Sequence, residues 1–522
     1  MSSNPDYDLS APIQEGTGLR QGLTSYGDAH FSLFLRKVFI KALGYSEDAL
    51  SRPIVGIVNT YSSFNPCHAN VPQLIEAVKR GVQLAGGLAI DFPTISLHES
   101  FASPTSMYLR NLMSMDTEEM IRAQPCDAVV LIGGCDKTTP AQLMGGISAN
   151  KPILHLVTGP MMPGSHRGVR IGACTDCRNN WAKFRAGAID IEDISAINDE
   201  LAPTAGTCGV MVLQAIGGST NAVVHLMAIV GRHPLVAGTI TLDTVDEIGR
   251  KTPLLVDLKP SGENYMTDFH NSGGMLALLH QLKPLLHLGA RTYTANTLGE
   301  ELARITPLSV PQSLSCIQLF AEPLYPSSSL VVLKGNLAPG GAVMKASASK
   351  YRHLLNHRGR AVVFAGSADL AQRLDDHDLD VTADSVLVLQ NIGPVGNPGM
   401  PEAGMIPIPR KLAEQGVTDM LRVSDGRMSG TAGGTIALHV SPEAANPSSV
   451  LGIVRTGDWV ISIFSQQLVL PKLSLQLPSE SGTACDFLAT FPEGATSGLG
   501  EGNRAAESRS RSSQSMATTE EL

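Results

Sequence analysis

Short apolar runs in the first third of the chain are separated by stretches with helical spacing. The runs that are typical of buried strands are residues 53–59, 126–134 and 151–157. Apolar residues at helical spacing predict helices near residues 31–42, over residues 72–85 and from Pro140 onward. Strand, loop, helix and strand in this order indicate βαβ units, so we expect a parallel sheet in this part of the chain.

The second half of the chain is richer in short β-forming runs. They are residues 329–335, 361–364, 385–390, 452–454 and 459–464, and turns rich in Gly, Pro, Asp and Asn separate them. The expected fold class is therefore α/β, with an N-terminal α/β domain over residues 1–322 and a β-rich domain over residues 323–477. The polar composition of residues 478–522 predicts a disordered tail.

Two loops of the predicted parallel sheet carry polar residues. Residues 59–67 follow the first apolar run, and residues 133–139 follow the second. Ligands of parallel sheets bind at the carboxyl ends of the strands. We therefore expect a functional site where these two loops lie.

Composition and charge exclude several function classes. The chain has 522 residues, of which 43% are hydrophobic and 17% charged, and its net charge is −9. This charge does not support a basic nucleic-acid-binding surface. The longest apolar runs fall far short of the roughly 20 residues of a membrane span, and residues 1–17 show no signal or transit peptide. We expect a cytoplasmic protein, with a mitochondrial location as the alternative.

Three cysteines lie in loops with distinctive neighbours. Cys67 is in Asn-Pro-Cys-His, Cys135 in Gly-Gly-Cys-Asp-Lys-Thr and Cys208 in Ala-Gly-Thr-Cys-Gly. Thiolates bind iron–sulfur clusters or zinc, whereas a single cysteine is more often a small buried apolar residue. The set of three favours metal binding. Cys174 and Cys177 form the one Cys-x-x-Cys pair, and no second pair completes a zinc ribbon.

Carboxylates in the same and other loops are candidate ligands of Mg²⁺, which prefers oxygen. Glu99 follows an apolar stretch, Asp136 follows Cys135 directly, and Glu402 lies in a segment dense in Gly and Pro. The alternative for each is a surface carboxylate. Lys137 beside them is a candidate anion clamp or salt-bridge partner.

Ser429 is the candidate catalytic hydroxyl. It lies in the turn-rich sequence Ser-Asp-Gly-Arg-Met-Ser-Gly, where an ordinary loop serine is the alternative. No P-loop, Gly-x-Gly-x-x-Gly or His-Glu-x-x-His motif is present in the sequence. These absences argue against a standard NTPase, a Rossmann dehydrogenase or a zincin.

Taken together, the motifs resemble the dihydroxy-acid and 6-phosphogluconate dehydratase family, and within it the L-arabinonate-type sugar-acid dehydratases. The resemblance extends over roughly residues 22–445. The segments that carry it are residues 65–68, 133–138, 172–178, 205–208, 217–221, 398–402 and 424–430.

The resemblance implies an α/β domain followed by a β-barrel-like domain, in a homodimer or homotetramer. It implies an iron–sulfur cluster, [2Fe–2S] rather than [4Fe–4S], held by three cysteines that leave one iron position open. It also implies Mg²⁺ held by carboxylates and by a carbamylated lysine. Carried over to this chain, the cluster ligands are Cys67, Cys135 and Cys208, and the Mg²⁺ ligands are Glu99, Asp136, Lys137 and Glu402.

The implied reaction is the dehydration of a 2,3-dihydroxy acid, such as an aldonate, to a 2-oxo-3-deoxy acid. Mg²⁺ would bind the carboxylate and the C2 hydroxyl, and the open iron would bind the leaving C3 hydroxyl. Ser429, as an alkoxide, would take the C2 proton. The substrate is thus a small molecule, and neither a nucleic acid nor a membrane is an expected partner.

The chain departs from the family pattern in three places. A block is missing after Met211, because residues 212–218 continue directly with a later part of the pattern. After about Ser448 the family's barrel strands should continue, but here residues 466–477 and a polar tail follow. His98 stands where Gly is expected. Two alternatives therefore stay open. One is a dihydroxy-acid dehydratase of branched-chain amino acid synthesis, and the other is an inactive, truncated paralogue.

Overall fold

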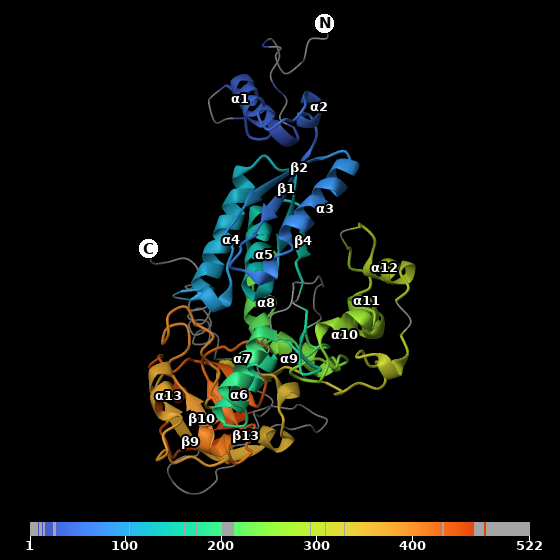
Figure 1. Ribbon diagram of the computed structural model, residues 1–522. Coiled ribbons are helices and arrows are strands. Elements are labelled where there is room, and N and C mark those ends of the chain that lie inside the picture. Colours follow the sequence, from blue (N-terminus) through green and yellow to red (C-terminus); the bar gives the residue numbers. More distant parts are fainter. Residues whose placement is uncertain are drawn as a thin grey trace, which may run out of the picture. The chain divides into compact units, whose positions relative to one another are not determined.

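In the computed structural model the chain forms two compact units (Figure 1). Unit 1 contains Met1–Met161, Thr204–Val210 and Leu226–Thr239, and unit 2 contains Met162–Pro203, Met211–His225 and Ile240–Leu522. The structure describes residues 16–23, 28–103, 105–159, 162–172, 175–200, 213–292, 294–307, 310–327, 329–430 and 433–463, with Leu9, Ile13 and the strand Ser474–Gln476.

Unit 1 is built on a four-stranded parallel sheet. Its strands are β1 (Ile54–Asn59), β2 (Leu88–Pro93), β3 (Ala128–Gly133) and β4 (Ile153–Val157), in the order β2-β1-β3-β4. Its helices are α1 (Ala29–Lys41), α2 (Glu47–Leu50), α3 (Val71–Leu84), α4 (Ser106–Ala123) and α5 (Cys135–Ala149). The predicted parallel sheet is confirmed, and β2 is a strand that the apolar pattern did not single out.

Helices cover both faces of this sheet. Because successive side chains of a strand point to opposite faces, Ile57 and Val130 pack with α3, whereas Val58 and Leu131 pack in a second cluster with Ile121 of α4. Each face is therefore buried against helices, as expected for a parallel sheet. This scaffold fixes the loops that leave the carboxyl ends of β1, β2 and β3.

The helix after β3 begins at Cys135, five residues before the predicted start at Pro140. Proline is common in a first helical turn and so marks a start, but here Pro140 lies inside α5. The residue before the helix is Gly134, which packs too closely for a side chain, because a Cβ there would lie 1.9 Å from Thr158 Oγ1. The candidate residues Asp136 and Lys137 thus lie on a helical turn, and the prediction of a loop over residues 133–139 is wrong for residues 135–139.

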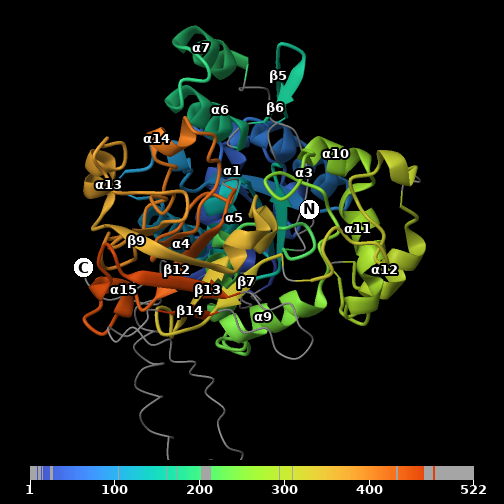
Figure 2. The ribbon, with the colours of Figure 1, turned by 90° about the horizontal axis from the view of Figure 1, so that it is seen from below.

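Unit 2 contains an eight-stranded mixed sheet (Figure 2). Its order is β14-β13-β9-β10-β11-β12-β8-β7, with β7 (Val331–Leu333), β8 (Gly341–Met344), β9 (His357–Phe364), β10 (Val386–Leu389), β11 (Arg422–Ser424), β12 (Ile436–Ser441), β13 (Trp459–Ile463) and β14 (Ser474–Gln476). Strands β9 to β12 pair in parallel, and the flanking pairs are antiparallel. Within the described strands no pairing joins β14 to β7, so the barrel-like expectation is met only in part.

Helices and a hairpin complete unit 2. They are α6 (Thr175–Arg185), α7 (Ile191–Glu200), α9 (Leu242–Lys251), α10 (Met266–Asn271), α11 (Gly274–Leu282), α12 (Leu298–Arg304), α13 (Ser367–Arg373), α14 (Arg410–Ala413), α15 (Val450–Ile453) and the hairpin β5 (Gly164–His166) with β6 (Val169–Ile171), while α8 (Asn221–Gly231) contributes to both units. The strand predicted over residues 452–454 is wrong, because α15 occupies most of it. A three-residue apolar run does not distinguish a strand from a buried helical turn.

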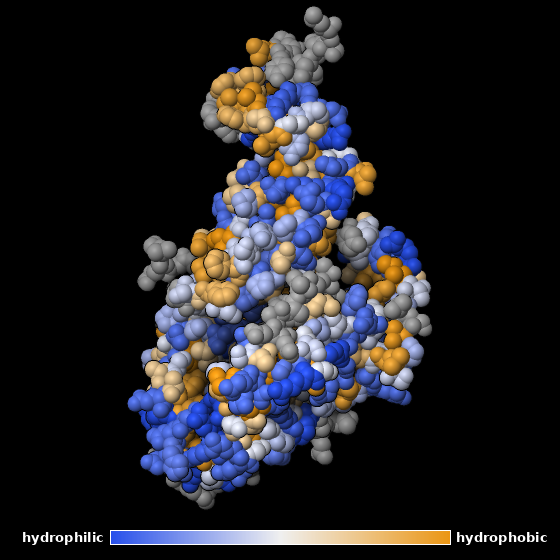
Figure 3. Space-filling model, in the orientation of Figure 1, coloured by the Kyte–Doolittle hydropathy of each residue, from blue (hydrophilic) through white to orange (hydrophobic). Residues whose placement is uncertain are grey.

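The surface of unit 1 carries an apolar patch on α1, visible as orange atoms in Figure 3. The exposed side chains are Phe31, Phe34, Val38 and Phe39, with Leu43 just after the helix. Phe31 and Phe34 stack with ring centroids 6.5 Å apart. None of the described helices has the length and apolar character that a membrane crossing requires.

Candidate active site

A buried histidine holds the loop that follows β1. His68 lies in the short helix η3 (Pro66–His68) and is fully buried. Its Nε2 accepts a hydrogen bond from the Gly134 backbone at 3.0 Å, and its Nδ1 lies 2.7 Å from the Thr60 carbonyl oxygen. An Nε2 that accepts leaves the proton on Nδ1, so His68 donates to Thr60. The side chain thereby links the end of β1 to the start of α5.

Asn65 joins the same loop to the segment after β2. Its Oδ1 accepts from the backbone N–H of Cys67 at 3.1 Å, and its Nδ2 donates to the Leu97 carbonyl at 2.9 Å. The next two residues in that segment are His98 and Glu99. The loops after β1, β2 and β3 therefore meet at one edge of the sheet, as the strand pattern predicts for the loops after β1 and β3.

The structure brings Cys67 and Cys135 together at this edge. Cys135 begins α5 with a φ of 69°, a left-handed conformation that is uncommon for a residue other than glycine and often marks a functional site. A hydrogen bond from Cys135, helped by one from His98, lowers the pKa of Cys67 to about 5. The same contact with Cys67, and then burial, raises the pKa of Cys135 well above its usual value. The pair thus holds one thiolate at neutral pH.

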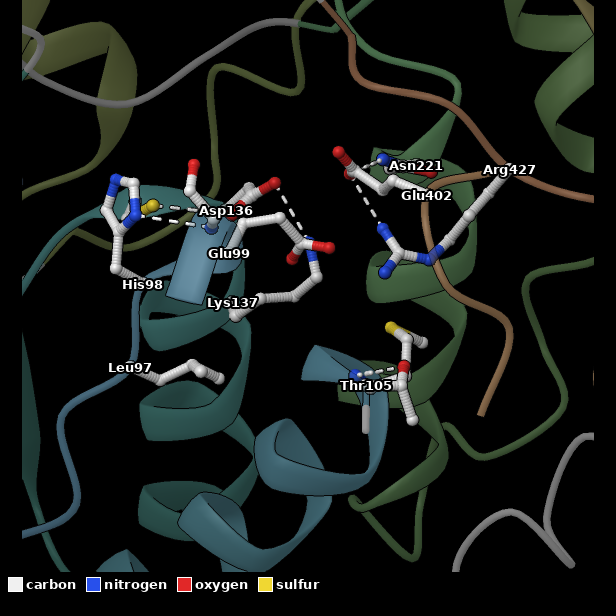
Figure 4. Close-up of polar contacts among 12 residues, drawn as sticks. Leu97, His98, Glu99, Thr105, Asp136, Lys137, Asn221, Glu402 and Arg427 are labelled. Atoms are coloured by element: carbon white, nitrogen blue, oxygen red, sulfur yellow. Dashed lines mark hydrogen bonds and ion pairs between the residues drawn. The ribbon is translucent and has the colours of Figure 1, made fainter. Parts of the chain in front are cut away.

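Two carboxylates lie beside the thiols and share a buried lysine (Figure 4). Lys137 Nζ lies 3.0 Å from Glu99 Oε2 and 2.9 Å from Asp136 Oδ2, and its side chain is 1% exposed. Asp136 Oδ1 also accepts a hydrogen bond from Cys135 Sγ at 3.3 Å. As an ammonium, Lys137 forms a buried ion pair; as a carbamate it would be a further oxygen ligand, and the three anions would then require a cation.

Glu402, the fourth candidate ligand of Mg²⁺, belongs to unit 2. Its Oε1 accepts from Arg427 Nη1 at 2.7 Å and from Asn221 Nδ2 at 3.0 Å (Figure 4). Arg427 is buried and also donates through Nε to the Met400 carbonyl at 2.6 Å. Glu402 is therefore fixed in one orientation by two donors, as a preorganised ligand must be.

The loop that carries Ser429 is held on both sides of that residue. Asn221 Nδ2 donates to the Met428 carbonyl at 3.0 Å, and Lys345 Nζ donates to the Gly430 carbonyl at 2.8 Å. Gly430 leaves no room for a side chain, because its Cβ would lie 2.4 Å from Ser219 Oγ. Ser429 itself is half-buried. Its position is thus fixed through its neighbours' carbonyl groups.

Other cysteines named from the sequence fall outside this grouping. Cys208 and Cys174 lie outside the described residues, so the third proposed cluster ligand stays a prediction. Cys177 lies on α6 and is half-buried. Cys126 and Cys316 are buried in apolar cores.

The described residues fit both groups that the sequence resemblance implies. Cys67 and Cys135 adjoin each other and hold a thiolate, which is the form that ligates iron. Carboxylate oxygens of Glu99 and Asp136 lie within 4.8 Å of each other, close enough for one hard cation. Soft sulfur and hard oxygen donors therefore lie side by side in unit 1.

The sequence of the chain matches the models of one enzyme family along most of its length. The dihydroxy-acid/6-phosphogluconate dehydratase N-terminal model matches residues 52–213 and 209–301, and the C-terminal model matches residues 315–476. The chain belongs to the dihydroxy-acid/6-phosphogluconate dehydratase family. It is an enzyme of the dehydratase type, a hydro-lyase. The N-terminal match is split at residues 209–213, where the family pattern is expected to break.

Several bacterial proteins are similar to this chain over most of its length. A 6-deoxy-6-sulfo-D-gluconate dehydratase of Pseudomonas putida is 38% identical over 79% of this chain and 81% of its own length. An L-arabonate dehydratase of Azospirillum brasilense is 38% identical over 82% and 84%. An L-arabinonate dehydratase of Rhizobium leguminosarum bv. trifolii (strain WSM2304) is 36% identical over 83% and 85%.

Reasoning from the sequence missed the roles of three side chains. Asn221 and Lys345 hold carbonyl groups of the serine loop, and His98 contacts Cys67. Asn221 lies in one of the family motifs, which was the available signal. Lys345 follows an apolar strand and showed no local signal, because its partner lies 85 residues away.

The lowered pKa of Cys67 predicts selective alkylation of the metal-free protein. Thiolate is the reactive form, so the rate with iodoacetamide should rise as pH passes through about 5 and then stay level to pH 7. Cys126, whose pKa burial raises to about 11, should stay unmodified. Peptide mass spectrometry after timed labelling measures both sites. Equal labelling of Cys67 and Cys126 at pH 6 would contradict the prediction.

Proposed function

We propose that this chain catalyses the dehydration of a sugar acid with adjacent C2 and C3 hydroxyl groups to a 2-oxo-3-deoxy acid. The observation that carries the proposal is the pairing of the Cys67–Cys135 thiols with the Glu99–Lys137–Asp136 carboxylate group at one sheet edge. This donor set matches an enzyme that uses a cluster for the leaving hydroxyl and a hard cation for the carboxylate.

The substrate class is supported by the relatives. Those named for sugar acids are 36–38% identical to this chain, whereas dihydroxy-acid dehydratases are 28–30% identical over similar spans. A sugar acid is therefore favoured over the branched-chain dihydroxy acid. The second candidate, dehydration of 2,3-dihydroxy-isovalerate, becomes an outcome of the experiment below.

In this proposal Cys67, Cys135 and Cys208 hold a [2Fe–2S] cluster, and Glu99, Asp136, carbamylated Lys137 and Glu402 hold Mg²⁺. When bound, the two groups would supply Lewis-acid chemistry for the leaving hydroxyl and for the substrate carboxylate. Arg427 and Asn221 fix Glu402, and His68 and Asn65 fix the thiol loop. Ser429 takes the C2 proton of the bound acid.

The test begins with protein purified without oxygen. We expect about two irons and two acid-labile sulfides per chain, the content of a [2Fe–2S] cluster. Incubation with Mg²⁺ and L-arabinonate or other five- and six-carbon aldonates should give a 2-oxo acid, detected by its semicarbazone absorbance and by mass spectrometry. Cys135→Ser should lose iron and activity together, whereas Cys316→Ala, in an apolar core of unit 2, should keep both.

Each outcome separates the alternatives. Turnover of 2,3-dihydroxy-isovalerate and of no aldonate would move the enzyme to branched-chain amino acid synthesis. A chain that binds no iron after reconstitution and dehydrates none of these acids would overturn the proposal and identify an inactive paralogue.

A further inference from the structure

Lys345 is a buried amine close to the serine loop, and the established family membership assigns it no role. It directly follows β8, its side chain is almost completely buried, and its Nζ lies 2.8 Å from the Gly430 carbonyl oxygen. No carboxylate of the described residues forms an ion pair with it. A lysine that only held this carbonyl in place would leave a charge buried without an anion, which is costly.

The described groups around Lys345 supply no negative charge that would balance a protonated amine. Strand β7 carries no titratable side chain, and β12 carries His439, whose pKa burial lowers to about 4, so this ring is neutral at pH 7. The serine loop carries Arg427, whose charge is matched by Glu402. Consistent with this, burial alone lowers the pKa of Lys345 to about 7. The amine is therefore available in its neutral form near physiological pH.

We propose that Lys345 is the base that deprotonates Ser429, so that the two residues form a serine–lysine dyad in the reaction proposed above. A neutral amine has two N–H bonds and one lone pair. One N–H donates to the Gly430 carbonyl, next to Ser429 in the chain, and this contact places the amine beside the serine loop. The inference rests on the proposed function, because Ser429 needs a base only if it removes the C2 proton.

Protons and electrons balance over one turnover. The Lys345 lone pair takes the hydroxyl proton of Ser429, giving an ammonium and an alkoxide. The alkoxide takes the C2 proton, and the C2–H electron pair forms the C2–C3 double bond as the C3–O bond breaks. The departing hydroxide takes the ammonium proton and leaves as water. Lysine and serine return to their starting forms, and the enol rearranges to the 2-oxo acid.

Substitutions at Lys345 separate a base from a structural anchor. Lys345→Met should lower kcat at least about 100-fold, the usual scale for loss of a general base. Lys345→Arg keeps a donor for the Gly430 carbonyl but cannot accept a proton, so it should be equally impaired. Lys345→Ala should regain activity with added methylamine or ethylamine, and Ser429→Ala should not. Lys350→Met, at an exposed lysine five residues on, should match the wild type.

A second measurement does not depend on catalysis. A lysine whose pKa falls from 10.5 to about 7 on folding binds fewer protons in the folded state between these values. Wild-type stability relative to Lys345→Met should therefore rise with pH from about 7 to about 10 and stay level below 7. Urea unfolding of both proteins across this range gives the difference.

The outcomes are distinguishable. An active wild type with an active Lys345→Arg and no amine rescue of Lys345→Ala would reduce Lys345 to an anchor and overturn the dyad. A pH-independent stability difference would overturn it as well, because the amine would not be neutral. A wild type that dehydrates none of the acids tested would fail the proposed function, and the dyad with it.

Discussion

Ser429→Ala should abolish most turnover while leaving the protein folded and its iron content unchanged. We expect kcat to fall about 100- to 10,000-fold, because the variant lacks the group that takes the C2 proton. The backbone of the loop should stay in place, since Asn221 and Lys345 hold the carbonyl groups of Met428 and Gly430 independently of the serine hydroxyl. Steady-state rates with the best aldonate, together with iron and sulfide per chain, measure both parts.

The matched control for this prediction is Ser448→Ala. Ser448 is an exposed loop serine of the same unit, and its hydroxyl donates to Asn446 Oδ1 at 2.8 Å. This variant should keep wild-type activity. Near-normal turnover by Ser429→Ala would remove Ser429 from the mechanism, and loss of iron in that variant would assign it a structural role at the cluster.

Much of unit 1 could be predicted from its sequence. Apolar runs that end in glycine or polar residues mark β1 and β3, and parallel strands place the following loops at one edge. The start of α5 could not be predicted, because it lies where Gly134 packs closely against Thr158 and where Cys135 is left-handed. Both are consequences of tertiary packing that no local pattern records.

The sheet of unit 2 was harder to predict for a different reason. Strand β11 begins with Arg422, which looks like a solvent-exposed residue in a sequence read without partners. Its charge is matched by Asp419, only three residues earlier, so a buried strand contains a guanidinium. The contacts of Lys345 and Asn221 with the serine loop join residues 85 and 207 positions apart. Contacts of this kind can be recognised only in the folded structure.

The largest stability effect should come from Asp419→Ala. Asp419 accepts hydrogen bonds from Arg422 Nη2 at 2.6 Å, from Thr435 Oγ1 at 2.8 Å and from the backbone N–H of Lys350 at 3.2 Å. Both side chains of the ion pair are almost fully buried. Removing one member leaves the other charge buried without a counter-ion, which costs about 3–5 kcal/mol.

The free energy of unfolding of unit 2 measures this effect. Trp181 and Trp459 both belong to unit 2 and are the two tryptophans of the chain, so fluorescence during urea unfolding reports on it. Glu247→Ala is the control, because its ion pair with Lys251 is 67% exposed on both sides and its loss should leave the free energy of unfolding nearly unchanged.

A double variant makes the cause of the loss explicit. Asp419→Ala combined with Arg422→Met should recover part of the stability, because the uncompensated guanidinium is gone. Arg422 also donates to the Ile406 carbonyl at 3.0 Å, in the segment that follows Glu402, and β11 leads directly into the serine loop. The single variant should therefore lose activity at temperatures where it is still folded. A loss below about 1 kcal/mol would show that this buried pair does not hold the strand that leads into the serine loop.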